Sequence, residues 1–188
     1  MNDLFKPYLR KCVLVFFDDI LVYSPNLADH ANHLRIVLNV LRKNQLFSKE
    51  SKCFFGQQKV EYLGYVISRD EVSTDSSKIE AMKQWPLPSS LKSLRDFLGL
   101  TGYYRKFIKG YGEISKPLTE MLKKDGFVWK PEAVAAFERL KEAMCQAPVL
   151  ALPNFNKKFY LETDVSPEGI GGVLTQEGRH IAYLSKAL

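Results

Sequence analysis

At 188 residues, with 46% hydrophobic and 26% charged residues and no low-complexity tract, the chain has the composition of a folded protein of one domain or two small ones. No basic region followed by an apolar segment opens the chain, and no apolar run is long enough to span a bilayer, so we expect no signal peptide, no transmembrane segment and an intracellular location of unknown compartment. Three scattered cysteines exclude a disulfide framework and a zinc site, and fit a reducing compartment.

The net charge of +6 is unevenly distributed along the chain. Residues 76–130 hold 11 Lys and Arg against 5 Asp and Glu, whereas the segments before and after them are nearly balanced. A localised basic excess indicates a polyanionic partner, although a solvated helical surface would produce the same count.

The first predicted element is a β-hairpin formed by Tyr8 to Phe17 and Ile20 to Ser24, with Asp18 and Asp19 at its tip. The flanks next to the tip, Cys12 to Phe17 and Ile20 to Tyr23, are apolar at every position, which predicts strands covered on both faces. Two readings are open: the Asp pair is an ordinary tight turn, or a divalent cation meets carboxylates that are costly at the mouth of a buried sheet.

A helix is predicted from about Ala28 to Lys43, where His30 and His33 lie three residues apart without a third metal ligand nearby and are read as an ordinary polar face. Short strands are then predicted at Leu46–Ser48, Lys52–Phe55 and Val60–Ser68. Gly64, inside the last of these, indicates a bend or the close approach of another backbone, from protein or nucleic acid.

After a polar connection over residues 69–77, a helix is predicted from Lys78 to Gln84, capped by Asp75 or Ser76, and another from Ser90 to about Lys109. The second helix places one narrow stripe of residues on its surface, namely Lys92, Arg95, Gly99, Gly102, Lys106 and Lys109. Glycines between cations would let a sugar-phosphate backbone come close, whereas the alternative is helix packing through the two glycines with solvated cations. The charge distribution favours nucleic acid.

The remaining elements are helices at Ser115–Lys124, with Pro117 in the first turn, and about Pro131–Cys145, followed by an extended tether at Ala147–Pro153. Three strands then follow, Phe159–Ser166, Gly169–Gln176 and Ile181–Ser185. Three strands without a covering helix cannot bury their faces, so we expect the sequence to stop inside a domain.

Four motifs occur in a characteristic order: Phe16-Phe17-Asp18-Asp19 with Ile-Leu-Val-Tyr-Ser, Tyr62 to Ser68, Leu94 to Ile108, and Leu161 to Ser166. In this order and spacing the chain resembles, over essentially its whole length, the reverse transcriptase/ribonuclease H region of the pol polyprotein of gypsy-class long-terminal-repeat retrotransposons.

The resemblance implies an α+β fold: 1–75 as the C-terminal part of a polymerase palm, 76–125 as a helical thumb, 126–155 as a connection, and 156–188 as the N-terminal part of a ribonuclease H-like domain. It implies that Asp18 and Asp19 bind Mg²⁺ in the polymerase, and that Asp164 is the first catalytic, metal-binding carboxylate of ribonuclease H. Leu63, Gly64 and Tyr65 would hold the primer end, and the basic stripe would track an RNA/DNA template-primer duplex. The implied chemistry is two-metal transfer from deoxynucleoside triphosphates to a primer hydroxyl, with loss of pyrophosphate.

Two departures from the family pattern matter. First, the family usually has Tyr or Phe at the position of Phe16, and Phe16 fits this pattern but lacks the phenolic oxygen of Tyr. Second, the upstream metal-binding aspartate of the palm and the later carboxylates of ribonuclease H are expected outside residues 1–188. Asp29 lies on the following helix and does not replace the palm aspartate. A partial carboxylate set should bind Mg²⁺ weakly. We therefore expect neither polymerase nor ribonuclease H activity from this chain alone. The alternatives are a non-catalytic nucleic-acid-binding remnant or a functionless relic, and the oligomeric state is open.

Overall fold

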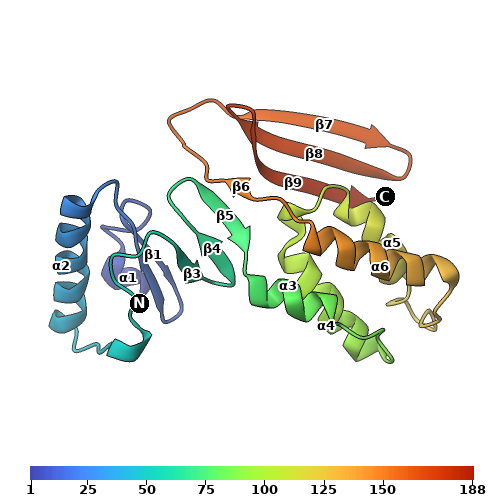
Figure 1. Cartoon of the computed structure of the whole chain (residues 1–188), viewed down its shortest axis with the longest axis horizontal. Helices are drawn as coiled ribbons and strands as arrows, with labels where there is room; N and C mark the ends of the chain where they lie inside the picture. Colours follow the sequence, from blue (N-terminus) through green and yellow to red (C-terminus); the bar gives the residue numbers. More distant parts are fainter. The chain divides into compact units, whose positions relative to one another are not determined.

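The computed structural model describes residues 1–188 and divides the chain into two compact units, Met1–Tyr62 and Leu63–Leu188 (Figure 1). Both mix helices with antiparallel strands, which confirms the expected α+β class. None of the helices is both long and apolar enough to cross a membrane.

The first unit has one long helix and a two-stranded hairpin. Asn26 caps the long helix, because its side chain accepts a hydrogen bond from the Asp29 amide at 2.8 Å. The apolar side of this helix packs on one face of the hairpin, around Val13, Val37 and Leu41. The elements of the unit are α1 (Asn2–Phe5), β1 (Val13–Phe16), β2 (Asp19–Val22), α2 (Leu27–Lys43), the 3₁₀ helix η1 (Glu50–Lys52) and β3 (Val60–Tyr62).

Three predictions for this unit are wrong. The hairpin is shorter than expected, since residues 8–12 form turns and not strand. Its strands are not covered on both faces: Leu14 and Phe16 alternate with the core positions Val13 and Val15 and are 37% and 49% exposed, because α1 and α2 pack against the Val13 side of the hairpin only. The expected strands at 46–48 and 52–55 are loop and η1, since short apolar runs without a pairing partner do not form a ladder.

The second unit contains four helices of eight or more residues and two small sheets. Its elements are β4 (Tyr65–Ile67), β5 (Glu71–Thr74), α3 (Ser76–Lys83), α4 (Leu91–Tyr103), the 3₁₀ helix η2 (Arg105–Phe107), α5 (Tyr111–Glu120), α6 (Pro131–Cys145), β6 (Leu150–Ala151), β7 (Tyr160–Ser166), β8 (Gly169–Gln176) and β9 (Arg179–Ala187). One core joins the helices, with Phe97, Phe137 and Leu140 almost completely buried between α4 and α6.

The helix predicted from Ser90 to Lys109 is too long. It begins as expected, with the Ser90 side chain accepting from the Ser93 amide, but it ends at Tyr103, and η2 and a left-handed Gly110 follow before α5 begins. The chain leaves the α-helix after Tyr103, and Tyr104 and Phe107 are nevertheless both buried in the core, Tyr104 as the C-cap of α4 and Phe107 within η2. Lys106 and Lys109 therefore do not continue the stripe along α4.

Other boundaries in this unit also differ from the predictions. The polar connection at 69–77 contains β5, and the expected tether contains β6, which pairs antiparallel with β5. The helix predicted from Ser115 starts four residues earlier, so Pro117 lies inside α5 and not in its first turn. The predicted helix at Pro131–Cys145 and the Asp75 cap of α3 are confirmed.

The C-terminal sheet has the order β7-β8-β9, with all neighbours antiparallel. Its strand β9 lies along α5 (Figure 1), where the Gly112 amide donates to the Ser185 hydroxyl at 3.0 Å. Every residue of β7 is exposed, whereas β8 is half-buried or buried and β9 lies against α5, so the expectation of three uncovered strands holds for β7 only.

Candidate nucleic-acid interface and carboxylate sites

The tip of the first hairpin carries the Asp pair in a tight turn. Phe16 pairs with Asp19, so the two turn residues are Phe17 and Asp18, and Asp19 opens β2. Phe17 has φ +49° and is 79% exposed, an unfavourable conformation for a large side chain and one that tends to persist at functional sites. Both carboxylates are exposed, and neither forms a hydrogen bond or ion pair within the chain.

The donor set at this tip fits Mg²⁺ in kind but not in number. Carboxylate oxygens suit a hard cation, and an exposed turn leaves space for water and substrate oxygens. Asp19 also lies near Tyr62, whose pKa is raised first by burial and then by the Asp19 charge. However, no group of three or more His, Cys, Asp or Glu side chains in the chain is arranged to hold a metal ion. Two carboxylates alone do not complete a metal site, and we assign no reaction step to a metal here.

His30 and His33, considered above as a metal pair, share one hydroxyl. The Ser24 Oγ lies 3.2 Å from Nδ1 of His30 and 2.7 Å from Nδ1 of His33. This is the contact pattern of a polar helix face.

The exposed side of α4 carries the first half of the predicted basic stripe. Lys92, Arg95 and Gly99 are exposed and Gly102 is half-buried. A Cβ added at Gly99 would meet no atom within 4 Å, whereas one at Gly102 would lie 3.4 Å from the Tyr111 hydroxyl. Packing between helices therefore accounts for at most one of the two glycines, and nothing in the chain requires glycine at 99.

Lys106 and Lys109 lie beyond the helix in different surroundings. The Lys106 Nζ sits 4.0 Å above the centre of the Tyr65 ring, in a cation–π contact, and burial lowers the pKa of its ammonium group. No carboxylate pairs with Lys106, so an anion from outside the chain could reach it. Lys109 is exposed and lines a pocket beside the C-terminal sheet.

The predicted primer-end residues form a tight turn and not a continuous strand. Leu63 and Gly64 both have positive φ, +53° and +74°, and they separate β3 from β4. Of the two readings of Gly64, the bend is confirmed, whereas the group that approaches Gly64 is a side chain and not another backbone: an added Cβ would lie 2.8 Å from the Tyr104 hydroxyl.

Two tyrosines at the end of α4 hold this turn. The Tyr103 hydroxyl donates to the Leu63 carbonyl at 2.6 Å, and the Tyr104 hydroxyl donates to the Gly64 carbonyl at 2.9 Å. The sequence reasoning assigned no role to these hydroxyls. The available signal was a consecutive Tyr pair in a helix, since a buried Tyr needs a hydrogen-bond partner.

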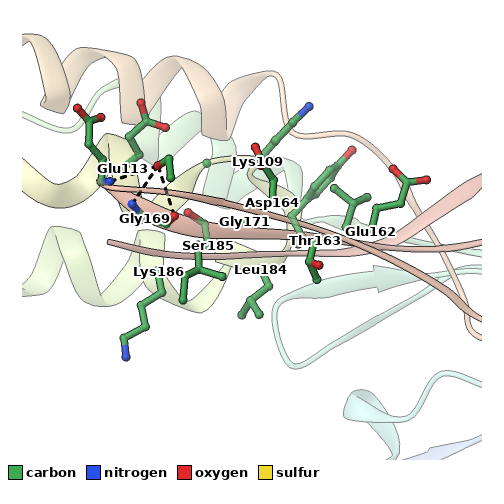
Figure 2. A pocket seen from close by; sticks show the side chains of 17 residues that line it. Lys109, Glu113, Glu162, Thr163, Asp164, Gly169, Gly171, Leu184, Ser185 and Lys186 are labelled. Atoms are coloured by element: carbon green, nitrogen blue, oxygen red, sulfur yellow. Dashed lines mark hydrogen bonds between the residues drawn. The ribbon is translucent and has the colours of Figure 1, made fainter. Parts of the chain in front are cut away.

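Asp164 lies on β7 opposite Gly171, and it lines an open pocket of about 510 Å³. Figure 2 shows Asp164 on the side of the sheet that faces Lys109 and Glu113, while Leu184 and Lys186 point to the other side. This alternation follows from the pleat of the strands. Because no further carboxylate joins Asp164 in a metal-binding group, it stands as a single candidate ligand.

The fold defined by these elements is that of a reverse transcriptase. A solved structure of the foamy viral protease-reverse transcriptase in complex with RNA/DNA hybrid superposes with a TM-score of 0.86 at 22% sequence identity, covering 100% of this chain and 26% of that one. Residues 1–67 match the profile described as reverse transcriptase (RNA-dependent DNA polymerase), and residues 129–188 match the RNase H-like domain found in reverse transcriptase.

Two Drosophila melanogaster sequences are similar over 100% of this chain. The Pol polyprotein from transposon 297 is 40% identical and that from transposon gypsy is 36% identical. The chain belongs to the reverse transcriptase/ribonuclease H family of retrotransposon Pol polyproteins, as the motifs indicated. It spans about a fifth of the length of these relatives, 18% and 19% respectively.

Proposed function

We infer that the chain is the duplex-holding part of an RNA-directed DNA polymerase of a retrotransposon, binding the RNA/DNA template-primer through α4 and its primer end through Leu63–Tyr65. The observation that carries this proposal is Gly99, a helical glycine with open space around it beside exposed Lys92 and Arg95.

Glycine in the middle of a helix costs about 1 kcal/mol relative to alanine. A glycine at 99 therefore needs a reason, and the chain supplies none through its own packing. A sugar-phosphate backbone lying against this side of α4 would supply one, because it needs a smooth surface flanked by cations. The foamy viral neighbour was solved with an RNA/DNA hybrid, which is consistent with this use of the fold.

The Asp pair supports a metal role in the intact enzyme. We assign Asp18 and Asp19 as Mg²⁺ ligands of the polymerase site and Asp164 as a ligand of the ribonuclease H site, in each case with further carboxylates from outside residues 1–188. When bound, the ions would activate the primer hydroxyl and stabilise the charge of the phosphoryl transfer. Deoxynucleoside triphosphates are the substrates under this proposal.

Duplex binding by the purified chain tests the proposal. We expect the affinity for an RNA·DNA duplex to fall steeply with salt, and the Arg95→Glu variant to lose at least about tenfold in affinity and to lower the salt slope by about 1. Arg139→Glu is a matched control, since Arg139 is also an exposed helical arginine but lies on α6. Equal losses in both variants would indicate unspecific attraction by net charge and would contradict the proposed surface.

Gly99→Ala tests the glycine argument itself. Because the added methyl group has space and alanine favours helix, we expect this variant to be more stable by about 1 kcal/mol and yet to bind the duplex more weakly. Stabilisation without any loss of binding would show that no duplex approaches α4 at Gly99.

A second candidate, a nucleic-acid-binding module without catalysis, is favoured by the incomplete carboxylate sets. Primer extension with Mg²⁺ separates the two: we expect no more product from the chain than from its Asp18→Asn, Asp19→Asn double variant. Extension above that control would show that the two carboxylates suffice.

A further inference from the structure

We propose that Tyr103 and Tyr104 are positioning residues that lock the Leu63–Gly64 turn onto the end of α4, so that the primer-end turn and the duplex-binding helix move as one body. This inference rests on the proposed function for what the turn contacts, but the lock itself is a property of the second unit.

The turn needs stabilising contacts from residues outside it, because its backbone conformation is unfavourable. Leu63 at φ +53° is a branched, non-glycine residue in the left-handed region, which costs about 1–2 kcal/mol. Such a residue persists only when its surroundings determine its conformation. The Tyr103 hydroxyl donates to the carbonyl of the strained Leu63 at 2.6 Å, and the Tyr104 hydroxyl donates to the carbonyl of the adjacent Gly64 at 2.9 Å.

The contacts are reciprocal, so the turn also holds the helix end. The Tyr65 hydroxyl donates to the Tyr103 carbonyl at 3.2 Å, and the rings of Tyr65 and Tyr103 stack with centres 5.1 Å apart. Tyr104 is 1% exposed and packs edge-on against Tyr65, with ring centres 5.5 Å apart. Hydrogen bonds run in both directions between residues 63–65 and residues 103–104, so they fix the orientation of the turn relative to the end of α4 as well as its distance.

The lock also determines where Lys106 lies. Its Nζ is 4.0 Å above the Tyr65 ring and 5.3 Å from the centre of the Phe107 ring. Because Tyr65 is held by Tyr103, this unpaired ammonium group is placed beside the turn and not free in solution. A phosphate at the primer end would therefore meet a preset cation, which reduces the entropy cost of binding.

Hydrogen exchange without nucleic acid tests the lock. In the full chain, Tyr103→Phe and Tyr104→Phe should raise the exchange rates of the amides of residues 63–65 at least fivefold. Tyr111→Phe is the matched control, since the Tyr111 hydroxyl bonds to Thr101 within the thumb and does not reach the turn. Tyr103 is 47% exposed, so its variant keeps the core intact even if Tyr104→Phe does not fold. Unchanged exchange in Tyr103→Phe would overturn the lock.

Binding to two duplexes of equal length, one with a recessed primer 3′ end and one blunt, tests the positioning role. Tyr103→Phe should lose at least threefold in preference for the recessed end, with blunt-duplex affinity changed less than twofold, while Tyr111→Phe should match the wild type. Faster exchange with an unchanged preference would overturn the positioning role. Absence of any duplex binding by the wild type would instead refute the proposed function, and the exchange result would still decide whether the hydroxyls hold the turn.

Discussion

Phe17 and Leu63 both place a large apolar side chain at positive φ in a tight turn, and the two turns differ in what holds them. Phe17 at the hairpin tip has φ +49° and is 79% exposed, and the Asp pair beside it has no partner in the chain. Leu63 has φ +53°, and tyrosine hydroxyls bind its carbonyl and that of Gly64. One turn is supported by the chain itself, whereas the other is left open to ligands.

The difference agrees with the roles proposed above for the two turns. A turn that positions a nucleic-acid end must be fixed before binding, so its support is internal. A turn that presents carboxylates to cations needs exposed oxygens, so its side chains stay free of internal partners. Backbone strain alone does not distinguish the two cases; the hydrogen-bond partners of the turn do.

Gly64→Ala should have the largest effect on stability, and it tests the internally supported turn. The added Cβ lies 2.8 Å from the Tyr104 hydroxyl at φ +74°, so we expect a loss of about 3 kcal/mol in unfolding free energy from strain and overlap together. Gly178 has the same φ with no atom within 4 Å, so Gly178→Ala should cost only about 1 kcal/mol. Denaturant unfolding of both variants measures the difference.

A double variant isolates the contact. In the Tyr104→Phe background the overlapping hydroxyl is gone, so Gly64→Ala should cost less there, by about 1 kcal/mol or more. Additive losses would mean that the Tyr104 hydroxyl is not what requires glycine at 64.

Only part of the structure of the Leu63–Gly64 turn could be predicted from the sequence, because its stabilising contacts are long-range. Gly64 signals a close approach, because glycine within a strand pattern is costly. The partner lies 40 residues away in the chain, where Tyr104 follows α4 directly, and no local pattern links the two positions. The prediction for α4 was too long because helical spacing continues to Lys109, whereas the chain changes to the 3₁₀ helix η2 after Tyr104, a change that the spacing does not indicate.

Elements determined by local chemistry were predicted well. The start of α4 at Ser90, the Asp75 cap of α3 and Pro131 at the start of α6 depend on neighbouring residues only. The half-exposed hairpin was missed because an apolar run does not reveal how many layers cover it. Asp164 was proposed from a sequence motif, whereas the other residues that line its pocket were not proposed.

Asp75 extends the comparison to a carboxylate with internal partners. Its side chain accepts hydrogen bonds from the Ser77 hydroxyl and amide, both at 2.8 Å, and these bonds lower its pKa. The stabilisation is therefore full above the unfolded pKa of about 3.9 and is lost as the pH falls through the lower folded pKa. Asp75→Ala should cost about 1 kcal/mol at pH 7.

The pH dependence separates the charge from the cap. The difference in unfolding free energy between the wild type and Asp75→Ala should shrink as the pH is lowered below about 3.9. Asp75→Asn can still cap α3 but carries no charge, so its difference in unfolding free energy from Asp75→Ala should not change with pH. A difference between wild type and Asp75→Ala that stays constant down to pH 2 would contradict the assignment of this pKa shift to the cap.

The Asp pair should show the smallest effect, because its carboxylates form no internal contacts. Without divalent cations, the Asp18→Asn, Asp19→Asn double variant should change the unfolding free energy by less than about 0.5 kcal/mol. With 10 mM Mg²⁺, a ligand bound at a dissociation constant of about 10 mM would stabilise the wild type by only about 0.4 kcal/mol. A Mg²⁺-dependent gain above about 1 kcal/mol in the wild type, absent from the double variant, would mean that two carboxylates on a strained turn bind the ion without further ligands. The hairpin tip would then be a self-sufficient cation site, and the contrast with the supported turn at 63–64 would lie in the ligand that each one holds.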